Sequence, residues 1–245
     1  MSQRTLSPEI IYEDASLLVI NKPPGISVLA DRESGESLLS RLRETFAGRG
    51  ETVFVVHRLD KDTSGVIVFG KTEEASRGLS MQFEHRHVEK TYLALVCGAV
   101  HPLEGTINLP IGPHPRDRTR MVVPHTGGKR SVTRYRVVES FRGFSLVELR
   151  PKTGRTHQIR VHLAAIGFPL AVDPVYGSGE GLLLSSFKKD YRPGKREEKP
   201  LIDRLSLHAQ RLAFDHPETN TRLQFESPLP RDFEIALKGL RKHGR

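Results

Sequence analysis

Strand-like segments follow one another along this chain with few helical segments between them. The predicted strands cover residues 10–12, 17–20, 53–56, 65–70, 91–96, 131–138, 144–149, 205–214 and 222–225. Neighbouring strands joined by short connections pair antiparallel, whereas parallel strands need a long crossover. The sequence therefore predicts an α+β fold, with a mixed, mainly antiparallel sheet and flanking helices, rather than a doubly wound α/β fold.

Four segments have helical character, at 36–47, 72–86, 156–166 and 231–240. Thr72 followed by two glutamates is typical of a capped helix start, and Gly167 predicts the end of the third helix. The segment 109–129 is rich in proline, glycine and arginine, which predicts an exposed excursion rather than a packed element. A charged loop is expected at 187–200.

Charge and cysteine content narrow the function classes. Lysine and arginine outnumber acidic residues 38 to 29, for a net charge of +9 and a pI near 9.8. This charge favours a polyanionic partner, but a soluble basic protein without such a partner would have the same composition.

Cys97 is the only cysteine, so no internal disulfide can form and a C-x-x-C metal site is excluded. The N-terminal residues lack an apolar signal core, and no stretch approaches the roughly 18 apolar residues of a membrane span. We therefore expect a cytoplasmic protein.

The polar turn HRLDKDTSG, residues 57–65, lies between two predicted strands. Its carboxylates and hydroxyls could simply cap turn amides. Asp60, Asp62, Ser64 and Gly65 also match the opening of a calcium-binding loop, but the position that requires a bidentate glutamate is Lys71. The calcium interpretation is therefore disfavoured, and a turn-capping role stays open.

Five segments in order resemble the RluA family of RNA pseudouridine synthases. They are NKPPG (21–25), HRLDKDTSG (57–65), KTYLALVCG (90–98), GRTHQIRVHL (154–163) and LSLHA (205–209). The resemblance implies an enzyme that isomerises uridine in ribosomal RNA or tRNA. It also implies the fold of that family with a central RNA-binding cleft, one catalytic domain over 1–245 without an N-terminal S4 domain, a monomer, and no metal or organic cofactor.

Three residues are implied to be catalytic. Asp60 corresponds to the family's nucleophile, a role for which a carboxylate is suited. Arg160 is expected to keep that carboxylate ionised, with Arg155 as the alternative. Tyr92 is expected to stack on the target base: an isolated tyrosine in such a strand more often belongs to a core, but the position within the family motif favours the active-site role. The atom that Asp60 attacks stays open.

Further residues are expected to contact RNA or to shape the site. A stacked uridine cannot reach such a pocket, so we expect the base to be flipped out. Arg58 is expected to enter the vacated space or to contact flanking phosphates, although a plain salt bridge is the alternative. His57 is expected to order the turn rather than to transfer protons, and Asn21 and Lys22 to shape the cleft. The full RNA-binding set is Arg58, Thr63, Arg116, Arg118, Arg120, Lys129, Arg130, Arg155 and His157. The loop arginines and lysine suit phosphates, which position RNA without reading its sequence, but any one of them could be merely solvated.

Two other functions compete. A non-catalytic RNA-binding protein with this fold would be expected to have lost at least one of Asp60, Tyr92 or the motif arginines, and none is lost. Hydrolysis of an N-glycosidic bond would use similar carboxylate chemistry, and only the resemblance disfavours it.

Overall fold

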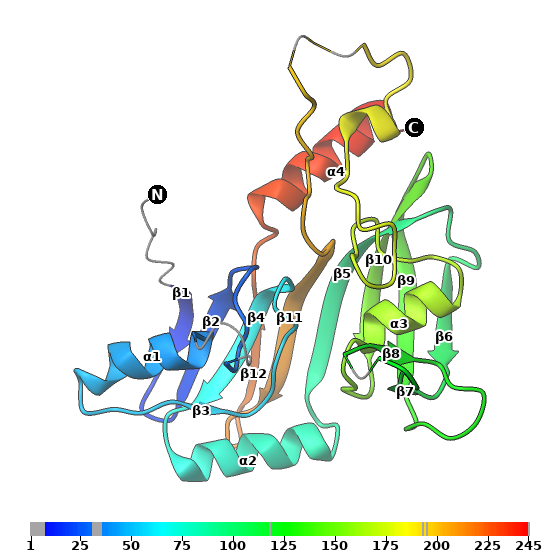
Figure 1. Cartoon of the computed structure of the whole chain (residues 1–245). Helices are drawn as coiled ribbons and strands as arrows, with labels where there is room; N and C mark the ends of the chain where they lie inside the picture. Colours follow the sequence, from blue (N-terminus) through cyan, green and yellow to red (C-terminus); the bar gives the residue numbers. More distant parts are fainter. Residues whose placement is uncertain (1–7, 31–35, 118, 193, 195, 245) are drawn as a thin grey trace. The chain divides into compact units, whose positions relative to one another are not determined.

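The described part of the computed structural model comprises residues 8–30, 36–117, 119–192, 194 and 196–244. It divides into two compact units, each described here by itself (Figure 1). Unit 1 spans Met1–Lys90 and Ala209–Pro228, and unit 2 spans Thr91–His208 and Leu229–Arg245. No helix in the described ranges is long and apolar enough to cross a membrane. The prediction of one catalytic domain stays a prediction.

Unit 1 is built on antiparallel strands. They are β1 (Glu9–Glu13), β2 (Leu17–Lys22), β3 (Phe54–Val55), β4 (Ser64–Gly70), the last part of β11 (Leu207–Asp215) and β12 (Arg222–Glu226). β2 pairs with β1 and β4, β3 pairs with β4, and β12 pairs with β11, all antiparallel. Every residue of β4 is buried. These pairings agree with the predicted fold class.

Two helices accompany this sheet, α1 (Leu38–Ala47) and α2 (Glu73–Glu84). The Thr72 hydroxyl accepts the Ala75 amide at 3.1 Å, and the two glutamates occupy the first turn of α2, so the predicted start is confirmed. α1 begins two residues later than predicted, because Ser37 forms a capping box that holds the first turn in place.

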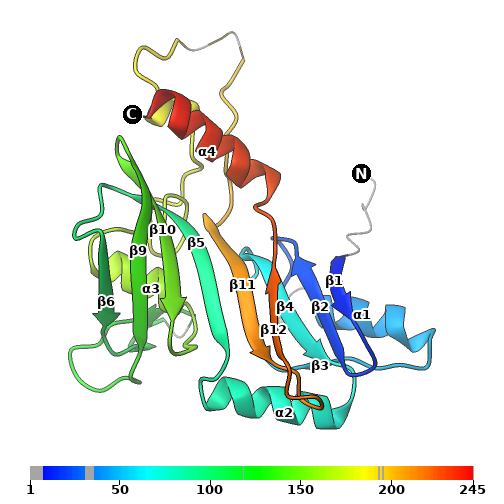
Figure 2. The same ribbon diagram turned by 180° about the vertical axis from the view of Figure 1, so that it is seen from behind.

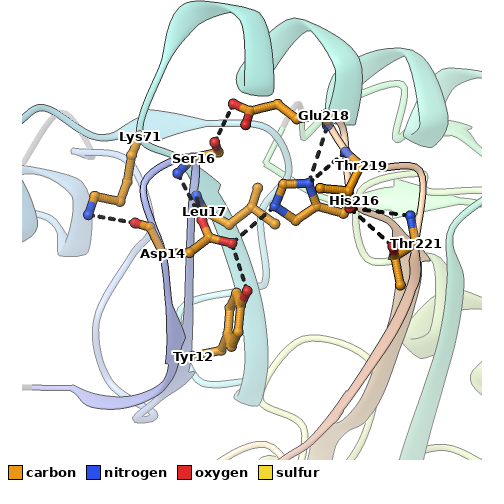
Figure 3. A network of polar contacts seen from close by, with 9 residues as sticks. All are labelled: Tyr12, Asp14, Ser16, Leu17, Lys71, His216, Glu218, Thr219 and Thr221. Atoms are coloured by element: carbon orange, nitrogen blue, oxygen red, sulfur yellow. Dashed lines mark hydrogen bonds and ion pairs between the residues drawn. The ribbon is translucent and has the colours of Figure 1, made fainter.

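A polar network fixes the β1–β2 turn to the turn after β11 (Figure 3). Asp14 Oδ2 accepts the Tyr12 hydroxyl at 2.7 Å and contacts His216 Nε2 at 3.0 Å, while Asp14 Oδ1 accepts the amides of Ser16 and Leu17. His216 Nδ1 accepts two backbone amides of its own turn at 3.2 Å each. Because Nδ1 is an acceptor, the imidazole carries its proton on Nε2 and donates it to Asp14.

Unit 2 contains a second run of antiparallel strands. In spatial order they are β5 (Glu89–Cys97), β10 (Phe144–Pro151), β9 (Val132–Phe141) and β6 (Glu104–Asn108). α3 (Gln158–Ala165) packs on one face, where Ile159 and Leu163 join the core formed with β5 and β10. α4 (Arg231–His243) packs on the other face through Phe233, Ala236, Leu237 and Leu240, which recur at helical spacing.

The predictions for unit 2 need two corrections. β6 was not predicted. The segment 109–129 is exposed for much of its length, but it is also ordered: β7 (Gly112–Pro113) pairs with β8 (Met121–Val122), and Ile111 is 1% exposed. Ile111 and Lys129 exchange both backbone hydrogen bonds, at 3.0 and 2.8 Å, which closes the segment as a hairpin. We call residues 109–130 the basic arm.

Candidate active site

The Asp60 turn connects β3 to β4 in unit 1. Leu59 is buried and anchors the turn, whereas Asp60 is half-buried and Arg58 is exposed. The Asp60 carbonyl accepts the Thr63 amide at 3.1 Å, which gives the backbone a tight turn. The sequence order of apolar and polar residues therefore holds Asp60 at the surface of a fixed loop.

Lys22, at the end of β2, fastens this turn from the interior. Its side chain is fully buried, and Nζ donates to the carbonyls of Pro23, Lys61 and Thr63 at 2.9, 2.8 and 2.9 Å. An ammonium has three donors and no acceptor, so each of these protons meets a backbone oxygen. Lys22 thereby joins the NKPPG segment to the residues that immediately follow Asp60.

Gly65 sets the exit from the turn. Its φ of +118° is open to glycine, and a Cβ built on it would lie 2.1 Å from the Ala209 carbonyl oxygen. The backbone of β4 therefore approaches β11 more closely than any side chain permits, and this contact fixes the position at which the turn ends.

His57 is held at the start of the turn by one edge and one face of its ring. Nε2 accepts the Val68 amide at 3.2 Å, and the ring stacks on Phe83 with centroids 4.4 Å apart. Desolvation, followed by the positive charge of Lys90, lowers the pKa of His57 from 6.5 to about 3. The imidazole is therefore neutral, with its proton on Nδ1, and the expectation that His57 does not transfer protons stays a prediction.

Thr63, predicted to contact RNA, is buried. Its hydroxyl has no hydrogen-bond partner within the described ranges. A buried orphan hydroxyl is uncommon in folded proteins. Its proposed contact with RNA stays a prediction.

In unit 2, Arg160 lies in α3 and forms a buried bidentate ion pair with Asp173. Nε contacts Oδ2 at 2.8 Å and Nη2 contacts Oδ1 at 2.9 Å, with side chains 5% and 0% exposed. Burial alone would raise the pKa of Asp173, but the Arg160 guanidinium and the amides of Val175 and Tyr176 hold it below its usual value. Asp173 was not predicted from the sequence, and the expected pairing of Arg160 with Asp60 stays a prediction.

Tyr176 follows Asp173 and links α3 to the basic arm. Its ring lies 5.0 Å from the Arg160 guanidinium and 5.8 Å from that of Arg120. Its hydroxyl accepts the Met121 amide at 2.8 Å and contacts His157 Nδ1 at 2.9 Å. Burial raises the pKa of Tyr176, so the hydroxyl keeps its proton.

The start of α3 is held by Gln158. Its amide group makes four hydrogen bonds: Nε2 donates to the Val132 carbonyl and the Thr133 hydroxyl, and Oε1 accepts the Thr153 hydroxyl and the Arg155 amide. The helix begins here, two residues later than predicted, because His157 adopts a left-handed φ of 55°. Arg155 itself is half-buried, and its Nε contacts the Arg130 carbonyl at 3.4 Å.

Tyr92 lies on the α3 face of the unit 2 sheet. It is partly buried against the core that includes Ile159 and Leu163 of α3, and it pairs in register with Leu149. This placement is compatible with both a core role and an active-site role for Tyr92, because the ring packs on the core and also lies on the sheet face that is covered by the helix carrying Arg160.

The basic arm carries most of the predicted phosphate contacts. Arg116, Arg120, Lys129 and Arg130 are exposed, whereas Arg118 lies outside the described residues. Arg120 also donates to the Val175 carbonyl at 2.8 Å, so it anchors the arm as well as adding charge.

Three features of the site were not predicted from the sequence. They are Asp173, Tyr176 and the carbonyl contacts of Lys22. Only Asp173 had a signal in the sequence: the polar pair Asp173-Pro174 directly follows the apolar segment LAV at 170–172.

The described residues contain no ready-made metal site. Within the part of the chain that the structure describes, no group of three or more histidine, cysteine, aspartate or glutamate side chains is arranged to hold a metal ion.

Known families and proteins match this chain over most of its length. The model of the family described as RNA pseudouridylate synthase matches residues 16–165. Ribosomal large subunit pseudouridine synthase D of Nitrosomonas europaea is 40% identical over 95% of this chain and 65% of its own length. The protein of the same name from Pseudomonas aeruginosa is 42% identical over 96% of this chain and 72% of its own length. The chain thus spans about two thirds of the length of these relatives.

Solved structures extend the similarity. Human RNA Pseudouridylate Synthase Domain Containing 4 matches with a TM-score of 0.72 and 28% identity, over 95% of this chain and 93% of that one. Human RNA Pseudouridylate Synthase Domain Containing 1 matches with a TM-score of 0.70 and 26% identity, over 100% and 98%.

Proposed function

Because this chain belongs to the family of RNA pseudouridylate synthases, we propose that it isomerises uridine to pseudouridine in large-subunit ribosomal RNA. The observation that carries the proposal is the match over residues 16–165, which includes the Asp60 turn, Tyr92 and Arg160. The named substrate of the two bacterial relatives supports ribosomal RNA. tRNA is the alternative substrate class.

The reaction breaks the bond between ribose C1′ and uracil N1, rotates the retained base, and joins C1′ to C5, from which a proton leaves. No redox step or energy donor is required. We assign the nucleophile to Asp60, whose carboxylate can form a covalent intermediate. The Lys22 contacts support this assignment because they fix the backbone that carries the carboxylate.

Two further residues complete the proposed site. Arg160 supplies the positive charge, and its bidentate contact with Asp173 fixes the plane of the guanidinium. Tyr92 supports the flipped base. Extruding a stacked uridine costs a few kcal/mol, which the phosphate contacts of Arg58 and the basic arm would offset.

The decisive experiment maps pseudouridine in total RNA from a strain that lacks this gene, with and without the wild-type gene restored. Loss of one or more sites in large-subunit ribosomal RNA is expected, and loss confined to tRNA would replace the substrate. Restoring Asp60→Asn should not return the missing sites, although the variant should fold and bind RNA. Full modification by Asp60→Asn would refute the nucleophile.

We further propose that the enzyme acts in the cytoplasm, as a monomer and without a metal. Tritium release from C5-labelled uridine in an unstructured RNA should be the same with and without EDTA, because such an RNA needs no metal to fold. Dependence of the release on added metal would contradict this part of the proposal.

A further inference from the structure

The face of the unit 2 sheet opposite α3 carries an open groove that the proposed chemistry does not use. Its volume is about 600 Å³, and it is lined by residues of β6, β9 and β10. Figure 2 views this sheet from the side away from α3, with the strands in front of that helix. α4 covers the end of the sheet near Phe141 and Phe144, whereas the groove lies toward the other end of the β9–β10 ladder.

Two rows of side chains cross the groove, as the strand register shows. In the first row, Arg136 pairs in register with Glu104 on one side and Glu148 on the other. Arg136 Nη2 lies 3.4 Å from Glu148. This row alternates in charge, so its members can compensate one another.

The second row is different because it contains two arginines and no acid. Arg134 pairs in register with Thr106 on one side and Arg150 on the other. Like charges directly opposite one another on paired strands are destabilising. Arg150 is offset by Glu148 of the first row at 3.0 Å, but Arg134 makes no ion pair with any described residue. The second row therefore has an uncompensated guanidinium beside a polar hydroxyl.

Three more cations lie close in sequence to the ends of β9 and β10 that carry this row. Lys129 and Arg130 of the basic arm lie three and two residues before the start of β9, and Lys152 follows β10 and donates its amide to the Val132 carbonyl at 2.9 Å. All three side chains are exposed. Exposed cations therefore flank, in sequence, the ends of the two strands that carry the second row.

We propose that Arg134 and Arg150 bind phosphates of the RNA substrate outside the catalytic site. The proposal rests on the proposed function for the identity of the ligand. The planar guanidinium of arginine can donate two hydrogen bonds to phosphate oxygens. An open groove can accommodate the sugar-phosphate backbone of RNA, and contacts with phosphates do not depend on the base sequence. An acidic protein segment is the other occupant that this charge could attract.

The salt dependence of RNA binding tests the proposal. The affinity of the full chain for a transcript of large-subunit ribosomal RNA is measured over a range of salt concentrations for wild type, Arg134→Gln and Arg150→Gln. Each substitution that removes a phosphate-binding guanidinium should reduce the slope of log affinity against log salt by about 0.7 to 0.9. Arg142→Gln is the matched control, because Arg142 is exposed in the β9–β10 turn of the same strands and the variant removes the same charge.

The outcomes separate the two proposals. The groove is not an RNA site if Arg134→Gln and Arg150→Gln give the same slope as Arg142→Gln. An acidic protein segment would then remain as the occupant of the groove. Circular dichroism and melting curves like those of wild type exclude unfolding as the cause of a lower slope. If the two groove variants lower the slope as predicted but wild type forms no pseudouridine, the proposed function fails and the RNA-binding groove stands.

Discussion

Arg160 and Asp173 meet through two parallel hydrogen bonds, Nε to Oδ2 at 2.8 Å and Nη2 to Oδ1 at 2.9 Å. Only a guanidinium provides both donors in one plane. Arg160→Lys should therefore keep the charge, remove the fork and lower kcat on the order of 100-fold, measured by tritium release under single-turnover conditions. Arg155→Lys serves as the comparison, and a larger decrease in that variant would show that the two arginines have been assigned the wrong roles.

Asp173→Asn tests the same pair by stability. Removing one partner of a buried ion pair leaves the other charge uncompensated, which costs about 3–5 kcal/mol. Urea denaturation of wild type and variant measures the difference. A variant as stable as wild type would mean that Arg160 finds another carboxylate.

Lys22→Met should destabilise the protein because the carbonyls of Pro23 and Thr63 would lose their donor, whereas the Lys61 carbonyl keeps the Gly25 amide at 3.0 Å. At about 1 kcal/mol or more for each orphaned group, the free energy of unfolding should fall by about 2 kcal/mol. Lys61→Met is the control in the same turn, since Lys61 is exposed, and should change stability by less than about 0.5 kcal/mol. Equal effects of the two substitutions would remove the proposed anchoring role.

The hydroxyl and the ring of Tyr176 can be tested separately with two substitutions. Tyr176→Phe removes the hydrogen bonds to Met121 and His157 and should weaken RNA binding about fivefold, or about 1 kcal/mol, because the basic arm is then less firmly anchored. Tyr176→Leu also removes the ring beside Arg160 and should lower kcat in addition. A kcat for Tyr176→Leu equal to that of Tyr176→Phe would show that the ring does not position Arg160.

His57 should make stability depend on pH. Its pKa is about 3 in the folded protein and 6.5 otherwise, so between these values the unfolded chain binds more protons. Stability contributed by the neutral ring is present above pH 6.5 and is lost as pH falls toward 3. Urea midpoints at pH 7 and pH 5 should therefore differ more for wild type than for His57→Gln, whereas the exposed His125→Gln should behave like wild type.

Much of the fold could be predicted from local signals. Thr72 and its two glutamates indicated the start of α2, because a cap is a property of three or four consecutive residues. β6 escaped prediction because Gly105 interrupts a short polar strand; the ring of Tyr135 lies against that glycine, where a Cβ would meet its hydroxyl at 2.8 Å. The proline, glycine and arginine content of the basic arm predicted an irregular segment. The hairpin was missed because it is held in part by Tyr176, which is distant in sequence.

In the candidate site, too, residues within local motifs could be predicted and those that depend on distant contacts could not. Asp60, Tyr92 and Arg160 were predicted because each lies within a recognisable sequence motif. Asp173 could not be found that way, because its importance comes from a partner 13 residues earlier on a helix. Lys22 was expected to shape the site, but its three carbonyl acceptors could not be predicted, because they come together only in the folded chain.

Gly65 also limits how this protein can be redesigned. A library that randomises the Asp60 turn to change RNA preference can vary the exposed Lys61, but every replacement at Gly65 drives a methyl group or more into the Ala209 backbone. Such a library should return glycine alone at this position, even when selected only for soluble expression. Evolving a new substrate would therefore have to proceed through loops that contact the turn, while the turn itself keeps its length and its exit.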